Sequence, residues 1–554
     1  MIRVSEIRLP LEHAPEALPE ALARRLGVSV SDIAEFSVVR RGYDARKRGR
    51  IVLVYSVDCA LPDEASVLSR HNDDPQIRIT PETQYEPVDV DVPALVAQPD
   101  FQRPVVVGAG PCGLMAALIL AQMGLKPIIL ERGKPVRERT VDTFALWRKS
   151  ELTPESNVQF GEGGAGTFSD GKLYTRVNDA RHLGRKVLDE FVRAGAPEEI
   201  LYLSKPHIGT FRLVSMVEHM RREIEAAGGT YRFYTRVERL LLDEKRQVRG
   251  VRLSDGEEIL TRHVILAVGH SARDTFEMLH AEGVAMEAKP FSIGVRIEHP
   301  QSLIDADQFG PQAGSEILGA ADYKLVHRTE DGRGVYSFCM CPGGTVVAAT
   351  SEPDRVVTNG MSQYSRAERN ANAGIVVELR PGVDYPDDPL AGVAFQRHWE
   401  SQAFVAGGGD YKAPGQRVED FLAGRPSTHL GTVTPSYRPG VTPTSLDRCL
   451  PDFVCAAIRE ALPVFARKLS SFALGDAVMT GVETRTSSPL QIPRKDDGES
   501  LNTPGLYPAG EGAGYAGGIM SAAMDGIRIA EAVALALAGR QASGLLRGKS
   551  DSLA

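Results

Sequence analysis

The most continuous hydrophobic pattern in the chain is the segment VVVGAGPCGLMAALILAQMGLKPIILE. Val105–Val107 is unbroken and β-branched, which predicts a buried strand. The Ala- and Leu-rich segment Leu114–Met123 predicts a helix, and Ile128–Leu130 predicts a second buried strand that ends at the acidic Glu131. The pattern therefore predicts a βαβ unit with glycines between its first strand and its helix.

These glycines have the spacing G-x-G-x-x-G. Gly108 permits a tight turn, Gly110 lets the backbone approach a pyrophosphate, and Gly113 lets helix and strand pack closely. The helix N-terminus directs free N–H groups at phosphates, and Glu131 can hold a ribose hydroxyl. The alternative is a glycine-rich turn in an ordinary βαβ unit. Strand, glycines, helix, second strand and acid follow in the order that a dinucleotide site requires, so we predict such a site.

Alternating and amphipathic segments precede this unit. They predict strands over residues 2–9, Glu35–Arg41, Arg50–Asp58 and Gln76–Ile79, and helices over Pro15–Leu26 and Asp63–His71. The order βαββαβ predicts a small ferredoxin-like α+β domain over residues 1–84. A linker over residues 85–103 follows, because this part of the chain is rich in proline and acidic residues.

A basic segment, RRGYDARKRGR at Arg40–Arg50, joins the middle strands of that domain. We interpret it as a solvated hairpin loop; the alternative is a clamp for a phosphate-bearing partner or substrate. The formal charge of −8 argues against general nucleic-acid binding, which needs a net basic surface. We therefore expect a small-molecule partner rather than a nucleic acid.

Helices are predicted over Val136–Lys149 and Arg212–Ala227, on either side of a second glycine-rich segment, QFGEGGAGTFSDGK. This segment, Gln159–Lys172, has too many glycines for regular secondary structure, so it either turns sharply or lies flat against a ligand. We interpret it as a loop that contacts a flavin or phosphate, and the alternative is a mobile surface loop. A series of strands follows, predicted over Tyr231–Tyr234, Val237–Leu242, Val248–Leu253 and Glu258–Leu260.

The segment His263–Gly269, HVILAVG, predicts a buried strand that returns to the nucleotide-binding sheet, and Ser271 is placed to cap the helix Arg273–Ala281. Residues 290–475 are a mixed insertion without nucleotide motifs. Near the C-terminus the sheet resumes with a short strand at Leu506–Tyr507, a turn at Gly510–Glu511 and a helix over Met520–Leu537.

A nucleotide sheet that begins near residue 104 and ends near residue 506, with a large excursion between, is the layout of FAD-dependent oxidoreductases. Glu511 lies where it can hold the ribityl chain or the pyrophosphate. The helix that begins near Ile519 would direct its positive end at the flavin pyrimidine ring and stabilise the charge of reduced flavin. No second G-x-G-x-x-G follows a strand, so no separate NAD(P)H domain is expected, although NAD(P)H can still bind transiently as an electron donor.

Length and composition narrow the class of protein further. A chain of 554 residues predicts two to four domains, and its six scattered cysteines form neither a disulfide framework nor a metal-binding spacing. The N-terminus has no signal-peptide pattern, and the apolar C-terminal helix contains Asp525, Arg528 and Glu531, which argue against a membrane span. We expect a soluble cytoplasmic protein without a metal site; its oligomeric state is left open.

Several long motifs carry a resemblance to one bacterial family. They are VVVGAGPCGL, NVQFGEGGAGTFSDGKL, LAVGHSARDTFEML, KPFSIGVRIEHP, SFCMCPGG, GVETRTSSP and LYPAGEGAGYAGGIMSAAMDG. The chain resembles the uncharacterised bacterial FAD-dependent dehydrogenases that carry an extra N-terminal α/β domain and, more distantly, the glutathione-reductase-type FAD fold. The resemblance implies FAD and redox chemistry without indicating a substrate. Such flavoproteins commonly have Asp where this chain has Glu511.

The fold class expected from pattern and resemblance together is α/β. A glutathione-reductase-type Rossmann domain, residues 104–289 and 476–540, is interrupted by a mixed α+β substrate domain at 290–475 and followed by a flexible tail at 541–554. The predicted cofactor is noncovalent FAD. The residues predicted to contact it are Gly108, Gly110, Pro111, Gly113, Glu131, Arg132, Gly163, Gly164, Val237, Gly269, Gly510, Glu511, Gly518 and Ile519.

For the substrate, the sequence indicates Glu483 and Arg485 in GVETRTSSP, which leads toward the C-terminal flavin loop. Arg485 can bind a carboxylate with two donors; the alternative is an internal Glu483–Arg485 pair. Cys339 and Cys341 share a face if they lie on a regular strand, either as a redox pair or as two small buried residues. No histidine is assigned a catalytic role.

Three functions remain open. The first is a two-electron FAD-dependent oxidoreductase, either a dehydrogenase or a reductase, that acts on an anionic small molecule. The second is a flavoprotein that acts on RNA or a protein partner through Arg40–Arg50, and the third is a non-enzymatic FAD-binding electron carrier.

Overall fold

The computed structural model describes residues 1–47 and 49–542, so Arg48 and residues 543–554 of the expected tail lie outside the described residues. Its centre is a parallel five-stranded sheet with the order β23-β11-β5-β6-β7. These strands are β5 (Val105–Val107), β6 (Ile128–Leu130), β7 (Thr230–Arg232), β11 (Val264–Leu266) and β23 (Leu506–Pro508). The strand expected to return to the nucleotide sheet does so, because β11 lies between β5 and β23.

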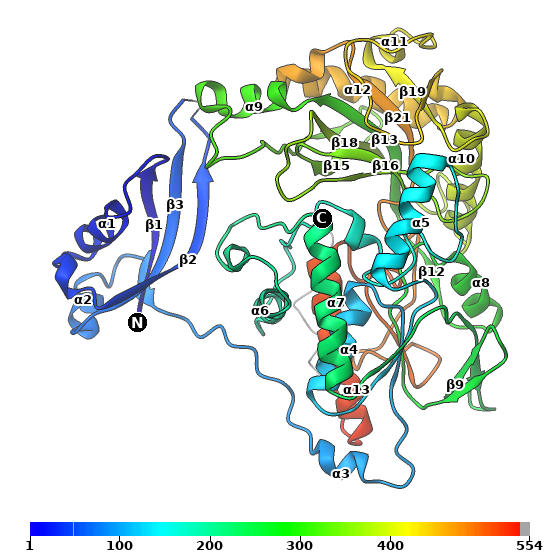
Figure 1. Ribbon diagram of the computed structural model, residues 1–554, viewed down its shortest axis with the longest axis horizontal. Coiled ribbons are helices and arrows are strands. Elements are labelled where there is room, and N and C mark those ends of the chain that lie inside the picture. The colour runs from blue at the N-terminus through cyan, green and yellow to red at the C-terminus, as the bar shows by residue number, and fades with distance from the viewer. Residues whose placement is uncertain (48, 543–554) are drawn as a thin grey trace.

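Three helices cover one face of this sheet: α4 (Pro111–Gln122), α7 (Thr210–Ala226) and α13 (Ile519–Leu537) (Figure 1). Ten of the twelve residues of α4 are buried, because the sheet and both other helices pack around it. Its contact with α13 is close: a Cβ at Gly526 would lie 2.2 Å from the carbonyl oxygen of Cys112. This packing fixes the start of both helices beside the carboxyl ends of the strands.

A second unit is built on a seven-stranded sheet with the order β14-β15-β18-β13-β21-β19-β20. The strands are β13 (Phe291–Pro300), β14 (Val326–Arg328), β15 (Gly334–Cys341), β18 (Asn370–Leu379), β19 (Ala413–Arg417), β20 (Val441–Pro443) and β21 (Val478–Glu483). Its helices are α9 (Gln301–Phe309), α10 (Ala391–Gly407), α11 (Val418–Leu422) and α12 (Asp452–Lys468). The central strand β13 is buried over nine of its ten residues, and its side chains belong to a large hydrophobic cluster that also includes buried residues of the N-terminal unit.

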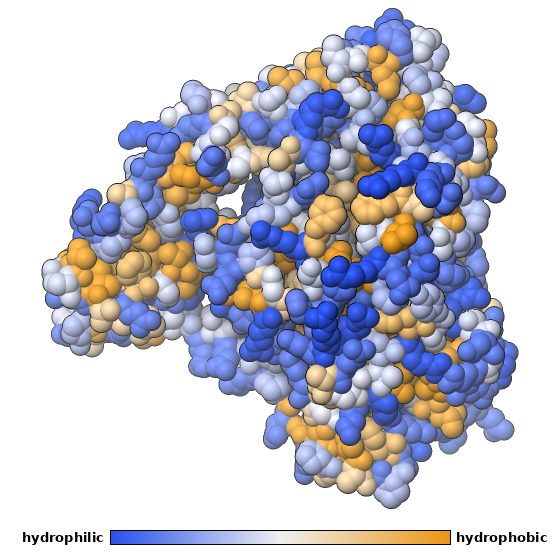
Figure 2. Space-filling model, in the orientation of Figure 1, coloured by the Kyte–Doolittle hydropathy of each residue, from blue (hydrophilic) through white to orange (hydrophobic). Residues whose placement is uncertain are grey.

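The N-terminal unit is a four-stranded antiparallel sheet with the order β2-β3-β1-β4. Its elements are β1 (Ile2–Pro10), α1 (Ala17–Leu26), β2 (Glu35–Asp44), β3 (Val52–Ala60), α2 (Glu64–Arg70) and β4 (Ile77–Ile79), in the expected order βαββαβ. A long connection containing α3 (Val92–Val96) leads to the central sheet, and Figure 2 shows an opening between this unit and the rest of the molecule. The unit touches the body where the N–H of Arg41 donates to the carbonyl of Tyr202 at 2.7 Å.

The remaining helices and strands pack around these three units. They are α5 (Val136–Lys149), α6 (Leu183–Arg193), α8 (Arg273–Ala281), β8 (Val237–Leu242), β9 (Val248–Leu253), β10 (Glu258–Leu260), β12 (Glu287–Ala288), β16 (Thr345–Ala348), β17 (Thr358–Met361) and β22 (Leu490–Gln491). The result is a mixed α/β fold with a parallel sheet.

Two local expectations are wrong. Strand β2 continues to Asp44, so the first part of the basic segment Arg40–Arg50 is strand rather than loop. The side chain of Ser271 does not cap α8; it bonds to Gln159 and Arg485 instead. Among the helices in the described part of the chain, none combines the length and the apolarity that a membrane span needs.

Candidate functional site

The central sheet carries a cavity of about 540 Å³ at the carboxyl ends of its strands. Ends of parallel strands are the usual position of ligands in α/β sheets, because the loops that follow the strands meet there. One half of the cavity is lined largely by glycine-rich backbone segments, from the turn after β5, the loop at 159–166 and the start of α13. The other half is lined by residues of the loop at 169–176 and of the second unit. We refer to them as the backbone half and the side-chain half.

The glycines of G-x-G-x-x-G divide into two kinds. Gly108 has φ +99°, and a Cβ at Gly113 would lie 1.9 Å from the carbonyl oxygen of Gly108, so both positions require glycine for the fold itself. A Cβ at Gly110 would meet only the Cα of Gly164, at 3.7 Å. Gly110 is therefore free of the protein's own atoms on the side of the cavity, as expected where a phosphate approaches.

The same fit appears on the far wall of the backbone half. A Cβ at Gly269, Gly517 or Gly518 would meet no atom within 4 Å, although all three residues line the cavity. Side chains there would project into the cavity and occupy space that a broad, flat ring needs. The backbone half therefore fits a phosphate-bearing flavin on steric grounds.

Glu131 ends β6 and is 5% exposed. Its carboxylate accepts hydrogen bonds from the backbone N–H groups of Ala109, Gly133 and Gly161, at 2.9 to 3.0 Å. These bonds tie both glycine loops to the end of the strand, a structural role that the expectation of a ribose contact did not include. The residue also lines the cavity, so a ribose contact remains a prediction.

Arg132 also lines the cavity, but its guanidinium is engaged elsewhere. It forms two-pronged pairs with Glu155 and Asp274 at 2.8 to 3.1 Å and lies over the ring of Phe160, 4.2 Å from its centroid. We infer that Arg132 fixes the wall of the cavity through these contacts.

Of the other residues predicted to contact the cofactor, Pro111, Gly164, Val237, Glu511 and Ile519 line the cavity. Gly163 and Gly510 do not; Gly163 packs toward Thr167, and the N–H of Gly510 donates to Asp525 at 2.8 Å. Both residues contribute to loop packing, and their direct contact with a cofactor stays a prediction.

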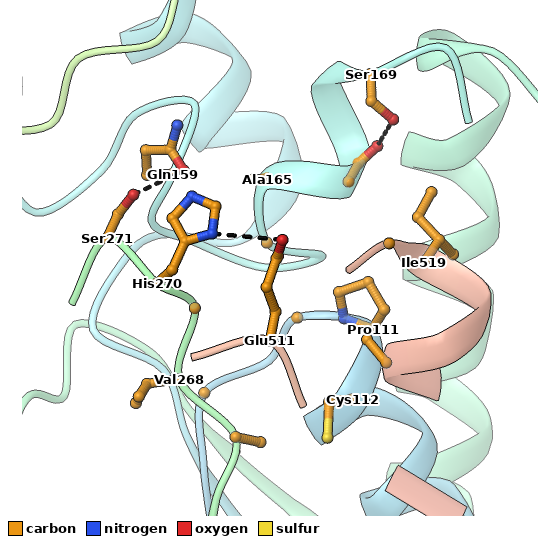
Figure 3. A pocket seen from close by; sticks show the side chains of 18 of the residues that line it. Pro111, Cys112, Gln159, Ala165, Ser169, Val268, His270, Ser271, Glu511 and Ile519 are labelled. Atoms are coloured by element: carbon orange, nitrogen blue, oxygen red, sulfur yellow. Dashed lines mark hydrogen bonds and ion pairs between the residues drawn. The ribbon is translucent and has the colours of Figure 1, made fainter. Parts of the chain in front are cut away.

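Glu511 and His270 face each other across the backbone half (Figure 3). The Nδ1 atom of His270 lies 3.4 Å from Oε1 of Glu511, and His270 is 9% exposed. Ile519, the first residue of α13, borders the same space. The positive end of α13 and the imidazole therefore both lie beside the carboxylate of Glu511.

Three polar side chains characterise the side-chain half: Asp170, Lys172 and Cys339. The carboxylate of Asp170 is paired through both oxygens with Arg366. The ammonium of Lys172 donates to the carbonyl of Met340, and its nearest carboxylate oxygen, on Asp170, is 3.7 Å away. Lys172 and Arg366 thus share the single carboxylate of Asp170, which leaves this group of three charges net positive.

The two residues proposed for substrate binding have other partners. Glu483 is buried and paired with Arg296 through two bonds, at 2.7 and 3.0 Å, so the alternative of a Glu483–Arg485 pair is wrong. Arg485 borders the cavity but is only 7% exposed, and it donates to Glu400, Ser271 and Ser351. The guanidinium is thus held by protein groups rather than presented to a carboxylate substrate.

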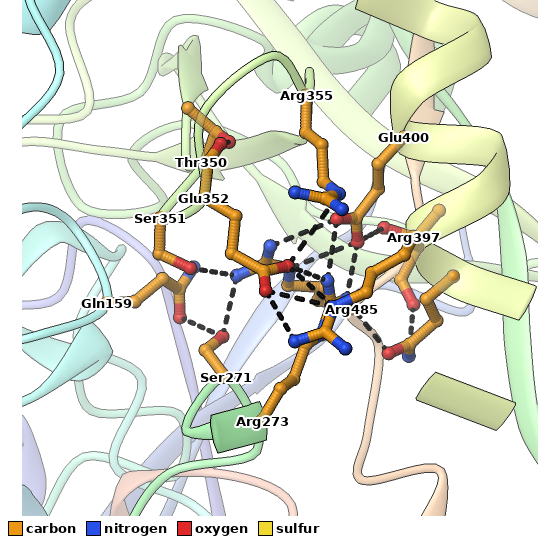
Figure 4. Close-up of polar contacts among 12 residues, drawn as sticks. Gln159, Ser271, Arg273, Thr350, Ser351, Glu352, Arg355, Arg397, Glu400 and Arg485 are labelled. Atoms are coloured by element: carbon orange, nitrogen blue, oxygen red, sulfur yellow. Dashed lines mark hydrogen bonds and ion pairs between the residues drawn. The ribbon is translucent and has the colours of Figure 1, made fainter. Parts of the chain in front are cut away.

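Arg485 belongs to a buried cluster of charges (Figure 4). Glu400 of α10 is fully buried and bonds to both Arg273 and Arg485, at 2.6 to 3.2 Å. Burial opposes ionisation, but the two guanidinium groups outweigh it and hold the pKa of Glu400 well below its usual range. The cluster joins α8, which follows the parallel sheet, to α10 of the second unit, and so fixes the two halves of the cavity relative to each other.

Sequence reasoning missed several residues of this site. Lys172 was noted only as the end of a glycine-rich segment, and nothing in the sequence pairs it with Cys339. Glu400 lies in the middle of a helix without a motif. The sequence does not show that Glu400 is a buried charged residue. This is seen only in the fold, where Arg273 and Arg485 pair with it.

Comparisons with known proteins agree with the cofactor that this geometry fits. Residues 290–486 match the family described as "FAD-dependent protein, C-terminal domain-like", residues 103–142 match an FAD binding domain, and residues 1–60 match a domain of unknown function. An uncharacterised protein from Clostridium beijerinckii is 47% identical over 531 residues, which is 96% of this chain and 98% of that protein.

Solved structures give a weaker likeness. L-proline dehydrogenase from P. horikoshii is 13% identical, with a TM-score of 0.34 over 81% of this chain and 96% of that one. A geranylgeranyl bacteriochlorophyll reductase-like protein from Thermoplasma acidophilum is 12% identical, with a TM-score of 0.36 over 80% of each chain. TM-scores this low carry no argument about the reaction.

Proposed function

Because the chain belongs to a family of FAD-dependent oxidoreductases, we propose that it holds FAD noncovalently and transfers two electrons to or from an anionic small molecule. The observation that carries the proposal is a continuous cavity in which a backbone half shaped for a flavin leads into a side-chain half with positive charge. We also propose that the domains are arranged as in the glutathione-reductase-type fold, with the boundaries expected from the sequence.

The residues around the backbone half would each hold one part of FAD. Gly110 and the N-terminus of α4 would receive the pyrophosphate, and Glu131 the adenosine ribose. Gly269, Gly517 and the start of α13 would border the ring system. When bound, FAD supplies the capacity to accept or donate two electrons.

The side-chain half supports an anionic substrate. Lys172 and Arg176 both line this half as cations, and Lys172 is the less exposed of the two. Asn359 and Tyr174 add hydrogen-bonding groups to the same wall. Lys172 thereby takes the substrate-binding role that the sequence suggested for Arg485. We propose NAD(P)H only as a transient electron donor.

The test has two steps. The purified protein should be yellow and should release FAD rather than FMN on denaturation, since the backbone half has room for an adenosine portion beside Glu131. A panel of small carboxylates and phosphates should then be screened for anaerobic bleaching of the flavin, with Lys172→Met as the binding variant and Lys205→Met as a surface control.

Bleaching by an anionic donor that weakens in Lys172→Met and persists in Lys205→Met supports the proposal. Release of FMN alone, or bleaching that is independent of Lys172, contradicts it. Fast one-electron exchange without any two-electron donor would instead indicate an electron carrier, and an RNA complex that is lost on charge reversal at Arg46 and Lys47 would indicate the basic segment as a contact.

A further inference from the structure

Cys339 and Cys341 lie at the end of β15, where the strand is irregular. Opposite strand β18, Phe338 pairs with Gly374 and Cys341 with Asn372, so the register between the two strands shifts across this stretch of β15. Cys339 is in this bulge with φ +42° and lines the cavity, whereas Cys341 is buried behind it. The bulge gives the two cysteines different surroundings instead of leaving them side by side on one face of a regular strand.

The two thiols are linked through one peptide carbonyl and through their protons. The Sγ–H of Cys341 points at the carbonyl oxygen of Cys339, 3.3 Å away. Hydrogen bonding from Cys341 lowers the pKa of the Cys339 thiol, against the effect of burial, and raises the pKa of Cys341 in return. Of the two thiols, Cys339 is therefore the one whose ionisation is favoured.

Two cations near Cys339 favour its anion, and one carboxylate opposes them. Lys172 and Arg296 lie close enough to lower the pKa of Cys339, and Asp170 has the opposite, weaker effect. Two carboxylates are neutralised elsewhere: Asp170 by Arg366, and Glu483 by the two-pronged pair with Arg296. Lys172 lies 3.7 Å from the carboxylate of Asp170, which it shares with Arg366.

Cys112 provides a comparison within the same cavity. It lies in the first turn of α4, borders the backbone half and is a free thiol like Cys339. Burial and the neighbouring Asp525 raise its pKa well above the ordinary value. The cavity thus contains one thiol in a cationic setting and one in an apolar, acidic setting.

We propose that Cys339 and Cys341 form a redox-active dithiol in the side-chain half of the cavity, with Cys339 as the reactive thiolate and Cys341 as its partner. Oxidation of the Cys339 thiolate and the Cys341 thiol forms one Sγ–Sγ bond, releases the thiol proton of Cys341 and passes two electrons to an acceptor; reduction reverses each of these changes. In the enzyme the partner in this exchange is the flavin, so this part of the inference rests on the proposed function.

The first experiment measures thiol reactivity on the purified full-length protein. The native protein is labelled with iodoacetamide at a series of pH values, and the labelling rate of each cysteine is followed by peptide mass spectrometry. Cys339 should react about tenfold or more faster than Cys112 at pH 7, with a midpoint below that of an ordinary thiol near 8.5. Lys172→Met should slow Cys339 about tenfold, and Lys205→Met should leave its rate unchanged.

The second experiment tests the pairing. Diamide, which takes up two electrons and two protons, should give a Cys339–Cys341 disulfide in the wild type and none in Cys341→Ser. In that variant Cys339 should still be alkylated, and Cys455→Ser, which changes a buried cysteine of α12, should form the disulfide as the wild type does.

Fast labelling of Cys339 together with the 339–341 disulfide supports the proposal. Labelling of Cys339 no faster than that of Cys112, or the absence of the disulfide in the folded wild type, overturns it. Neither readout needs a substrate. If no donor bleaches the flavin but both thiol results are obtained, the proposed function is contradicted while the dithiol proposal stands.

Discussion

The two halves of the cavity are built from different kinds of atoms. The backbone half is made of glycines and helix N-termini, and the segments Val107–Pro111 and Gly161–Gly166 supply much of it. The side-chain half takes Lys172 from one loop, Cys339 from β15 and Arg485 from the chain after β21. Its groups act through charge and are held by partners that lie far away in the sequence.

Because of this difference, we expect substitutions in the two halves to affect different properties, ligand binding in one and stability in the other. A side chain added to the backbone half blocks space while leaving the protein folded, because the glycines at issue face the cavity and not the core. A charge removed from the side-chain half leaves its partner buried and unpaired, which costs stability before it affects any ligand. The following substitutions test that contrast, in order of decreasing effect.

Gly110→Val should have the largest effect, with flavin affinity lowered at least about 1,000-fold, or about 4 kcal/mol. The added side chain would fill the space where the pyrophosphate approaches, but its Cβ would lie 3.7 Å from the nearest protein atom, so the fold should persist. Flavin absorbance per protein and circular dichroism measure the two quantities. Gly113→Ala is the contrasting variant, since its Cβ would meet the oxygen of Gly108 at 1.9 Å and should unfold the unit. A yellow Gly110→Val protein would show that the phosphate lies elsewhere.

Glu400→Gln should lower the free energy of unfolding by about 3–5 kcal/mol, because Arg273 and Arg485 would lose their shared buried carboxylate. Glu277→Gln is the matched control: it removes a half-exposed partner of Arg397 and should cost at most about 1 kcal/mol. Chemical denaturation measures both. Equal losses in the two variants would show that the cluster does not join the two units.

The stability of the protein at acidic pH should depend on the ionisation of Glu400. The pKa of Glu400 is held below its unfolded value near 4.3, so the stability that it contributes is present above that pH and is lost as the pH falls. In Glu400→Gln this part of the acid sensitivity should disappear. The midpoint of thermal unfolding between pH 6 and pH 3 measures the effect, and an unchanged pH dependence in the variant would contradict the assignment.

Glu162, which is buried behind the glycine-rich loop at 159–166, should show a pH dependence of stability of the opposite sign. Burial raises its pKa to about 7, so its neutral form stabilises the fold below about pH 4.5 and this contribution is lost as the pH rises to about 7. The difference corresponds to roughly 3 kcal/mol at most. Glu162→Gln should therefore be more stable relative to the wild type at pH 8 than at pH 5, and Glu225→Gln on the exposed face of α7 should show no such change. Parallel pH profiles for both variants would contradict the prediction.

Arg485→Lys should have the smallest effect, a loss of about 1–2 kcal/mol in unfolding free energy with flavin retained. Lysine keeps the charge next to Glu400 but cannot also reach Ser271 and Ser351 with a planar fork. Denaturation and flavin content measure the outcome. If the variant had normal stability but no longer showed flavin reduction by a substrate, Arg485 would be a substrate-binding residue after all.

Much of the backbone half could be predicted from the sequence because its geometry is local. A strand, a glycine turn and a helix are neighbours along the chain, and backbone sterics alone fix Gly108 and Gly113 in their conformations. The same holds for the end points of β5, β6, α5 and α13, which agree with the predicted segments to within a few residues. The capping role expected for Ser271 is wrong, because its side chain bonds to Gln159 and Arg485 instead.

The side-chain half was decided by tertiary structure, because the energy of a buried charge depends on partners that sequence spacing does not reveal. Glu483 and Arg485 are two residues apart, yet they bind different partners, Arg296 and Glu400, because β21 ends at Glu483 and Arg485 lies beyond the regular strand. Cys339 and Cys341 likewise have distinct environments because of a β-bulge, which the local sequence pattern does not predict. Sequence alone determined that a dinucleotide can be held here; which charges face it was determined only when the second unit packed against the parallel sheet.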